Sequence, residues 1–269
     1  MEVVGAVDAE NESQILLANE TPSAAMQHFK ITLQYDGTDY NGWQIQPRGR
    51  TIQGELTRAL SILEQRSVTV HGAGRTDAGV HAEGQVASLS LERSFQPREL
   101  RDAINGNLER DIRVVAVEFS DSKFHARLSA KLKTYRYSIW TEDVVSPFVR
   151  RYVHHYRGSL DLEAMQRAAE MLLGEHDFRA FTVSTSEAEN SMRTIRRLDV
   201  VREPSGLAIY VSADGFLRYM VRAIAGTLID IGRGRLQTAS IGRALTTLDR
   251  IHAGPTAPAC GLTLLRVDY

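Results

Sequence analysis

The sequence predicts an α+β fold built from two consecutive β-α-β-β-α-β units. Short runs in which apolar residues alternate indicate strands, and longer runs in which they recur every three or four residues indicate helices. These runs follow one another in the same order twice along the chain. With 269 residues, of which 43% are hydrophobic, the chain can bury a sizeable core.

The first unit opens with alternating apolar residues that stop at the turn-forming pair Asp36-Gly37. A helix is expected after Thr51, whose side chain can cap it. Pro97 suits the first turn of a second helix. In chain order, the six elements are expected around residues 31–35, 52–63, 68–70, 87–91, 97–108 and 115–119.

The second unit repeats this order. Gly174 is expected to end its first helix and Gly232 its second. Its elements, with one extra helix before the last strand, are expected around residues 135–139, 162–173, 198–200, 207–211, 217–231, 240–248 and 265–269. Two such units indicate a duplicated ferredoxin-like fold with antiparallel sheets joined across a central cleft. We assign residues 28–124 to the first half and 125–269 to the second.

Residues 1–27 show neither the helical nor the strand periodicity of apolar residues. They carry five acidic and no basic side chains, so we expect a disordered acidic extension. The remaining residues hold 32 basic and 28 acidic side chains, a net charge of +4. All but four of these basic residues are arginines. Arginine suits bidentate phosphate contacts and stacking on bases, although a biased genome composition produces the same excess.

The composition also excludes some classes of protein. A single cysteine, Cys260, leaves no intrachain disulfide, which is typical of a reducing compartment. The first residues show no basic segment followed by an apolar run, and no stretch of 18 apolar residues occurs. These features argue against secretion and membrane insertion and predict a cytoplasmic protein.

The glycine-rich segment GAGRTDAGVHAEGQV, residues 72–86, is the main candidate site. A dinucleotide-binding loop would need glycine where Asp77 stands, and a P-loop would need Gly-Lys-Ser/Thr, so a phosphate-binding loop is excluded. His71, Asp77 and His81 match the spacing of no common metal site, and Arg75 would compete with a cation for the aspartate. We therefore expect no metal.

Two interpretations of Asp77 remain open from the residues alone. In the first, the loop presents the carboxylate to a large ligand, and Arg75 or another arginine favours its ionised form. Such an aspartate suits nucleophilic catalysis. In the second, Asp77 hydrogen-bonds its own backbone in a turn.

The glycine-rich segment resembles the signature of the tRNA pseudouridine synthase A (TruA) family. Further motifs similar to those of the family follow its order: TLQYDGTDYNGWQIQ, FHARLSAKLKTYRY, LLGEHDF, GFLRYMVRAIAGTLIDIGRG and GLTLLRVDY. The resemblance runs from about residue 29 to residue 269 and does not include the acidic extension. It implies a pseudouridine synthase fold.

The resemblance further implies an isomerase that converts uridine to pseudouridine at positions 38, 39 and 40 of the tRNA anticodon stem-loop, without metal or organic cofactor. Asp77 would be the nucleophile, attacking C1′ of the ribose or C6 of the uracil. Tyr135 would contact the flipped base with its ring and take part in proton transfer with its hydroxyl. Arg222 would pair with Asp77, whereas Tyr137 is expected to be a core aromatic. Family members bind one tRNA across two subunits, which implies a homodimer.

A wider basic surface is expected to contact the tRNA backbone. The candidates are Arg48, Arg50, Arg127, Lys131, Lys133, Arg136, Arg193, Arg196 and Arg197. Two alternatives remain, a catalytically silent RNA-binding protein on the same fold and a pseudouridine synthase acting on another RNA. The negative charge of Asp77 argues against the silent binder, because it would repel the RNA.

Overall fold

The structure of the protein is a computed structural model that describes residues 26–183 and 190–269. The expected acidic extension therefore lies outside the described residues, except for its last two. Gln27 belongs to the first strand instead of the extension, because it pairs with Leu91. The expected boundary between residues 124 and 125 falls in the segment that joins the two halves and stays a prediction.

The first half contains the expected β-α-β-β-α-β unit. Its elements are β1 (Gln27–Tyr35), α1 (Ile52–Glu64), β2 (His71–Gly72), β3 (His81–Leu91), α2 (Pro97–Gly106) and β4 (Ile112–Phe119). The Thr51 side chain accepts a hydrogen bond from the Gly54 backbone N–H at 3.2 Å and so caps α1. Pro97 occupies the first turn of α2, where its missing N–H costs nothing.

The second half repeats the unit with additions. Its elements are β5 (Leu132–Trp140), β6 (His154–His155), α3 (Leu162–Glu170), β7 (Gly174–Asp177), β8 (Met192–Glu203), β9 (Gly206–Ala213), α4 (Met220–Gly232), α5 (Ala239–Thr247) and β10 (Leu262–Asp268). Of these, β6 and β7 were not expected from the sequence. Both are short and lack the alternation that identifies a strand.

The two halves share one sheet, which runs in the order β4-β1-β3-β10-β5-β9-β8-β7. Within each half the strands follow the same spatial order, fourth, first, third and second strand of the unit. In the first half the second strand is β2, which pairs with the same edge of β3 that β10 contacts. Pairing within each half is antiparallel, except that the short strand β6 lies parallel to β5. The halves meet where β10 lies parallel to β3, with Thr263 opposite His81 and Leu264 opposite Ala82. The α+β class and the duplicated unit are thus confirmed.

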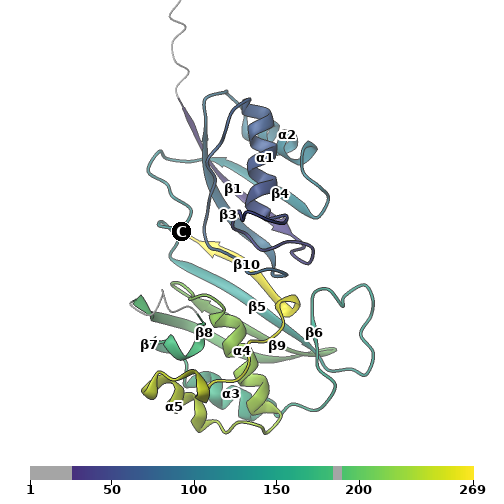
Figure 1. The fold of residues 1–269 in the computed structure, drawn as a ribbon, viewed down its shortest axis with the longest axis vertical. Helices are drawn as coiled ribbons and strands as arrows, with labels where there is room; N and C mark the ends of the chain where they lie inside the picture. The colour runs from purple at the N-terminus through teal and green to yellow at the C-terminus, as the bar shows by residue number, and fades with distance from the viewer. Residues whose placement is uncertain (1–25, 184–189) are drawn as a thin grey trace, which may run out of the picture.

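The helices form two groups, one over each half of the sheet (Figure 1). In that view α1 lies over the strands of the first half, and α3, α4 and α5 lie over those of the second, with β10 and β5 between the two groups. The buried side chains of both halves form one large apolar cluster. Tyr137 belongs to it and is fully buried, which confirms it as a core aromatic. Within the described residues, no helix has the length and apolar character needed to cross a membrane.

Bulges in β4 and β10 alter which side chains of these strands are buried. In β4 the register against β1 shifts at Val115, so that Ile112 and Val114 are buried whereas Val115 is 41% exposed. In β10 the register shifts between Leu264 and Arg266. The extra residue reverses the alternation, and strict period-two counting therefore assigns the wrong face beyond it.

Two elements, β2 and α3, also have other bounds than expected. Val68 and Val70 are buried but lie before the strand, because β2 consists only of His71 and Gly72. The helix α3 ends at Glu170, four residues before Gly174, which instead opens β7 with a left-handed φ of 95°. Of the apolar residues in the turn that follows the helix, Leu172 is buried, whereas Met171 and Leu173 are 39% and 41% exposed.

The β10 bulge generates a test of the fold. Leu264 is fully buried at the joint between the halves, whereas its neighbour Leu265 is half-buried. We expect Leu264→Ala to lower the free energy of unfolding by about 2–5 kcal/mol, since it leaves a cavity in the core. Leu265→Ala should cost less than half as much, as measured by urea unfolding of both variants. Equal losses would contradict the described register.

Candidate active site

Asp77 lies in the loop between β2 and β3, and backbone hydrogen bonds hold this loop against the segment that follows β1. The Trp43 N–H donates to the Thr76 carbonyl at 3.0 Å, and the Gly79 N–H donates to the Tyr40 carbonyl at 3.3 Å. The Asp77 carbonyl accepts from the Val80 N–H at 3.1 Å, which closes a turn. The loop backbone is therefore fixed, and the carboxylate extends from it.

Gly42 lets the two segments come this close. Its φ is 86°, and a Cβ there would lie 2.6 Å from the Thr76 carbonyl oxygen and 3.0 Å from the Asp77 carbonyl carbon. A residue other than glycine would be strained in this conformation and would also push the loop away. A glycine that helps to position Asp77 thus lies outside the glycine-rich segment.

The Asp77 carboxylate meets an arginine from the other half of the chain. Arg222, in the first turn of α4, donates from Nη1 to Asp77 Oδ2 at 3.2 Å. Its Nε donates to the Ala257 carbonyl at 2.8 Å, which fixes the guanidinium from a second side. The side chains of Asp77 and Arg222 are 21% and 15% exposed, so this ion pair is largely buried yet open to a ligand.

This contact favours the first interpretation of the aspartate. The Asp77 carboxylate extends away from its own loop and reaches an arginine 145 residues later in the chain. The guanidinium stabilises the negative charge on the carboxylate. A carboxylate in such a place can accept a proton or form a bond to an electrophilic carbon.

Two tyrosines lie close to the aspartate on the helix-covered face of the sheet. Tyr135, on β5, is 6% exposed and packs edge-on against Phe216 at 5.2 Å. Burial, helped by the proximity of Tyr35 and Asp77, raises the pKa of Tyr135. Burial also raises the pKa of Tyr35 to about 12, and its hydroxyl is hydrogen-bonded to Thr76 Oγ1 at 2.9 Å. Both hydroxyls are therefore protonated at neutral pH.

Tyr219 stands out by its backbone. It caps the start of α4 with a φ of 62°, a left-handed conformation that is rare for an aromatic residue. Two guanidinium groups lie near its ring, with the Cζ atoms of Arg218 and Arg222 at 4.9 and 5.1 Å from the ring centroid. This arrangement steadies the arginine that contacts Asp77.

Three of the expected RNA-contacting cations gather beside the aspartate loop. Lys133 Nζ lies 3.4 Å from where a Cβ on Gly74 would be. Burial and the nearby charges of Arg127 and Arg193 lower the pKa of Lys133, while Asp214 partly opposes this. The three come from the segment before β5, from β5 and from β8, so their grouping was not visible in the sequence.

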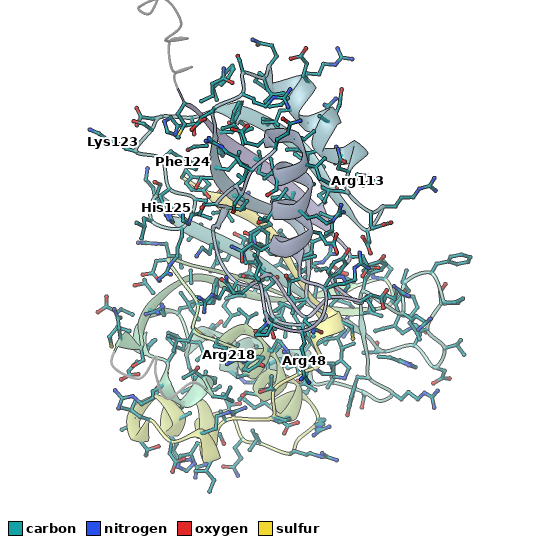
Figure 2. All side chains as sticks on the ribbon, turned by 45° about the horizontal axis from the view of Figure 1, so that its top comes forward. Arg48, Arg113, Lys123, Phe124, His125 and Arg218 are labelled. Atoms are coloured by element: carbon teal, nitrogen blue, oxygen red, sulfur yellow. The ribbon has the colours of Figure 1, made fainter. Side chains whose placement is uncertain are left out.

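The other expected site residues are more scattered. Arg75 is exposed and donates from Nε to Gln44 Oε1 at 3.2 Å, so the partner of Asp77 is the alternative arginine, Arg222. Arg50 pairs with Glu55 at 3.2 Å and lies over the Tyr40 ring. Arg48 is exposed, and Figure 2 places it between the two halves, as it does Arg218.

Four further candidates lie on the opposite sheet face or are exposed. Arg136 and Arg197 point to the sheet face opposite Tyr135, where Arg136 pairs with Glu83 and Arg197 with Asp199. Lys131 and Arg196 are exposed. Alternation along β5 explains the position of Arg136, since neighbouring residues of a strand face opposite sides.

The residues considered as metal ligands do not come together. His81 is buried and accepts a hydrogen bond from the Gly37 N–H at 3.1 Å, whereas His71 packs against His125. Among residues 26–183 and 190–269, no group of three or more His, Cys, Asp or Glu side chains is placed to hold a metal ion.

Sequence reasoning missed several residues that shape the site. These are Tyr35, Gly42, Phe216, Tyr219 and Ala257. Tyr35 and Phe216 looked like ordinary strand and helix-flanking aromatics, and Ala257 contributes only a backbone carbonyl. The left-handed backbone conformation of Tyr219 cannot be recognised from a single sequence.

Comparison with known proteins identifies relatives over most of the chain. A family model described as tRNA pseudouridine synthase matches residues 31–128 and 168–269. A tRNA pseudouridine synthase A from Moorella thermoacetica is 46% identical over 247 residues, which cover 91% of this chain and 100% of the relative. One from Citrifermentans bemidjiense is 41% identical over 245 residues, covering 91% and 98%. One from Methylobacterium nodulans is 42% identical, covering 91% and 96%.

The close approach of Gly42 to the aspartate loop gives a second test. We expect Gly42→Ala to lower the free energy of unfolding by about 1–3 kcal/mol, because it combines a strained φ with a steric clash. Gly106→Ala is the control, since a Cβ there meets nothing within 4 Å. In urea unfolding that variant should be neutral or slightly more stable. A Gly42→Ala protein as stable as the control would contradict the described contact.

Proposed function

This chain belongs to the tRNA pseudouridine synthase family, and from that premise we propose that Asp77 is its nucleophile. The family membership makes the protein an isomerase that converts uridine in tRNA to pseudouridine. The observation that carries the role of Asp77 is its contact with Arg222, which brings the two halves together around one reactive carboxylate.

The reaction moves the glycosidic bond within one nucleotide. The bond between ribose C1′ and uracil N1 breaks, a bond from C1′ to C5 forms, C5 loses a proton and N1 gains one. The Asp77 carboxylate attacks C1′ or C6 and is released when the new bond is complete. The detached uracil must turn without escaping, which favours a site shielded from water.

Neighbouring groups fit this sequence of steps. Arg222 holds the carboxylate in place and balances its charge before attack and after release. The protonated Tyr135 hydroxyl can donate a hydrogen bond to the uracil or return a proton to it. The ring of the same residue offers an apolar surface for a base taken out of its stack.

We propose the anticodon stem-loop, at positions 38, 39 and 40, as the substrate region. This proposal rests on the match to the family motifs around Asp77, Tyr135 and Arg222. The cluster of Arg127, Lys133 and Arg193 beside the loop supports binding of the RNA backbone close to the target. We further propose that the protein acts as a homodimer in the cytoplasm, as the family resemblance implies.

Asp77→Asn is expected to abolish pseudouridine formation while leaving tRNA affinity within about twofold, since amide and carboxylate have nearly the same shape. Release of the C5 hydrogen from uracil-labelled tRNA measures turnover, and mapping of the product gives the modified positions. Asp102→Asn, which changes an exposed carboxylate on α2, is the matched control. Substantial turnover by the Asp77→Asn variant would contradict the proposal that Asp77 is the nucleophile.

The same assay separates the other functions. Binding of tRNA without hydrogen release by the unaltered protein would indicate a silent RNA-binding protein. Pseudouridine formation in another RNA, without any in tRNA, would indicate a pseudouridine synthase that acts on that RNA.

Tyr135→Phe is expected to lower the rate about 10–100-fold with little change in tRNA affinity, since it removes the hydroxyl and keeps the ring. Tyr210→Phe, which removes a hydroxyl from the opposite sheet face, is the control. Because the pKa of Tyr135 is raised, its ionisation should cause no change in the rate between pH 7 and 9. A rate that rises over this range in the unaltered protein, and not in Tyr135→Phe, would show instead that the ionised tyrosine acts as a base.

A further inference from the structure

A second group of polar side chains lies in a hollow of about 620 Å³ away from Asp77. The hollow is bounded by residues 66–71, parts of β1 and β3, and residues 120–128. It is lined by three histidines, Lys123, Arg66 and six serine or threonine residues, and its described lining includes no carboxylate. Figure 2 shows Lys123, Phe124 and His125 together at one edge of the first half, with Lys123 pointing outward. A hollow of this composition suits an anion that accepts several hydrogen bonds.

Two histidines form the most specific part of the hollow. The rings of His71 and His125 lie 4.7 Å apart. His125 Nδ1 accepts from the backbone N–H groups of Arg127 and Leu128, at 3.1 and 3.3 Å. The proton of the neutral His125 ring is therefore on Nε2, which leaves that atom as a donor. Burial and the nearby His125 lower the pKa of His71, and an anion between the rings would reverse this effect.

Of Arg66 and Lys123, the arginine and lysine that line the hollow, Lys123 is available to a ligand. Arg66 is paired with Glu64 at 3.2 Å and with Glu92. His28 is hydrogen-bonded to Ser90 at 2.7 Å, and Asp121 accepts from the backbone N–H of Lys123. The Lys123 side chain is exposed and forms no ion pair with the described residues. Lys123 can therefore turn toward an anion held by the histidines.

The position of the hollow connects it to the aspartate loop. His71 directly precedes the glycine-rich segment, so its Cα lies no more than about 22 Å from that of Asp77, the span of six extended residues. Two residues after His125, Arg127 approaches Lys133 beside Gly74. Basic side chains thus follow one another from the hollow to the aspartate loop, as a polyanionic backbone requires.

We propose that this hollow binds a backbone phosphate of the substrate tRNA outside the target nucleotide. His71 and His125 donate hydrogen bonds to the phosphate, and Lys123 closes the contact from the rim. The identity of the RNA rests on the proposed function, but the phosphate contact can be measured without turnover.

The first experiment measures binding of an unmodified tRNA transcript as a function of salt. Lys123→Ala, and the double variant His71→Gln with His125→Gln, are each expected to weaken binding about tenfold, the loss of a charge-assisted hydrogen bond. Lys123→Ala should also reduce the slope of log affinity against log salt by about 1. Arg98→Ala, which removes an 87% exposed cation on α2, is the matched control and should change neither quantity.

Lys123 is exposed, so its loss cannot be attributed to misfolding. Equal tRNA affinity of the unaltered, Lys123→Ala and Arg98→Ala proteins would overturn the proposal. Because these are binding measurements, they stay informative even if Asp77→Asn retains turnover and the proposed nucleophile fails.

The second experiment follows the ring protons of His71 and His125 by NMR on the full chain. Without RNA, His71 is expected to titrate below its ordinary pKa of about 6.5. Saturating tRNA, or inorganic phosphate as a simpler probe, should raise the pKa of His71, since a bound anion favours the charged ring. An unchanged pKa with tRNA would overturn the proposal. A pKa raised already in the free protein would also overturn it, because the ring would then have a negatively charged partner without RNA.

Discussion

The pairing of β10 with β3 holds the two halves of the protein in one sheet, and the geometry around Asp77 depends on it. Asp77 belongs to the first half and Arg222 to the second, and their contact spans 3.2 Å. Such a distance is kept only if the two halves cannot shift relative to each other. The parallel contact of Thr263 and Leu264 with β3 provides this constraint at the middle of the sheet. The Asp77 carboxylate and its counter-charge are therefore fixed by the same backbone ladder that forms the core.

Around this fixed pair, the protein concentrates polar groups in an otherwise apolar region. The tyrosines at positions 35 and 135 are buried and stay protonated, so they add hydrogen-bond donors without adding charge. Tyr219 keeps an unfavourable backbone conformation, which costs about 1–3 kcal/mol, and its ring contacts the guanidinium groups of two arginines. Strain of this kind is typical of positions where function requires a particular orientation. The site is thus rigid on the protein side and open toward the ligand.

Much of this could be predicted from the sequence, and the exceptions have physical causes. The α+β class and both β-α-β-β-α-β units followed from periodicity, because long amphipathic runs such as those of α1 and β5 dominate local structure. The bulges at Val115 and after Leu264 could not be predicted, since each depends on pairing with another strand. The motif match drew attention to Asp77, Tyr135 and Arg222. The arrangement of Arg127, Lys133 and Arg193 comes from three distant segments, and only the folded chain shows which cations share a surface.

The order of the strands along the chain has a consequence for biosynthesis. The ribosome produces β3 early, but its partner β10 follows about 180 residues later. Contacts between such distant segments close late, whereas the local contacts of the first half can form as soon as it emerges. A nascent chain that carries the aspartate loop but lacks β10 has no ladder to hold Arg222 against it. The contact between Asp77 and Arg222 is therefore secured only after the last strand has been synthesised.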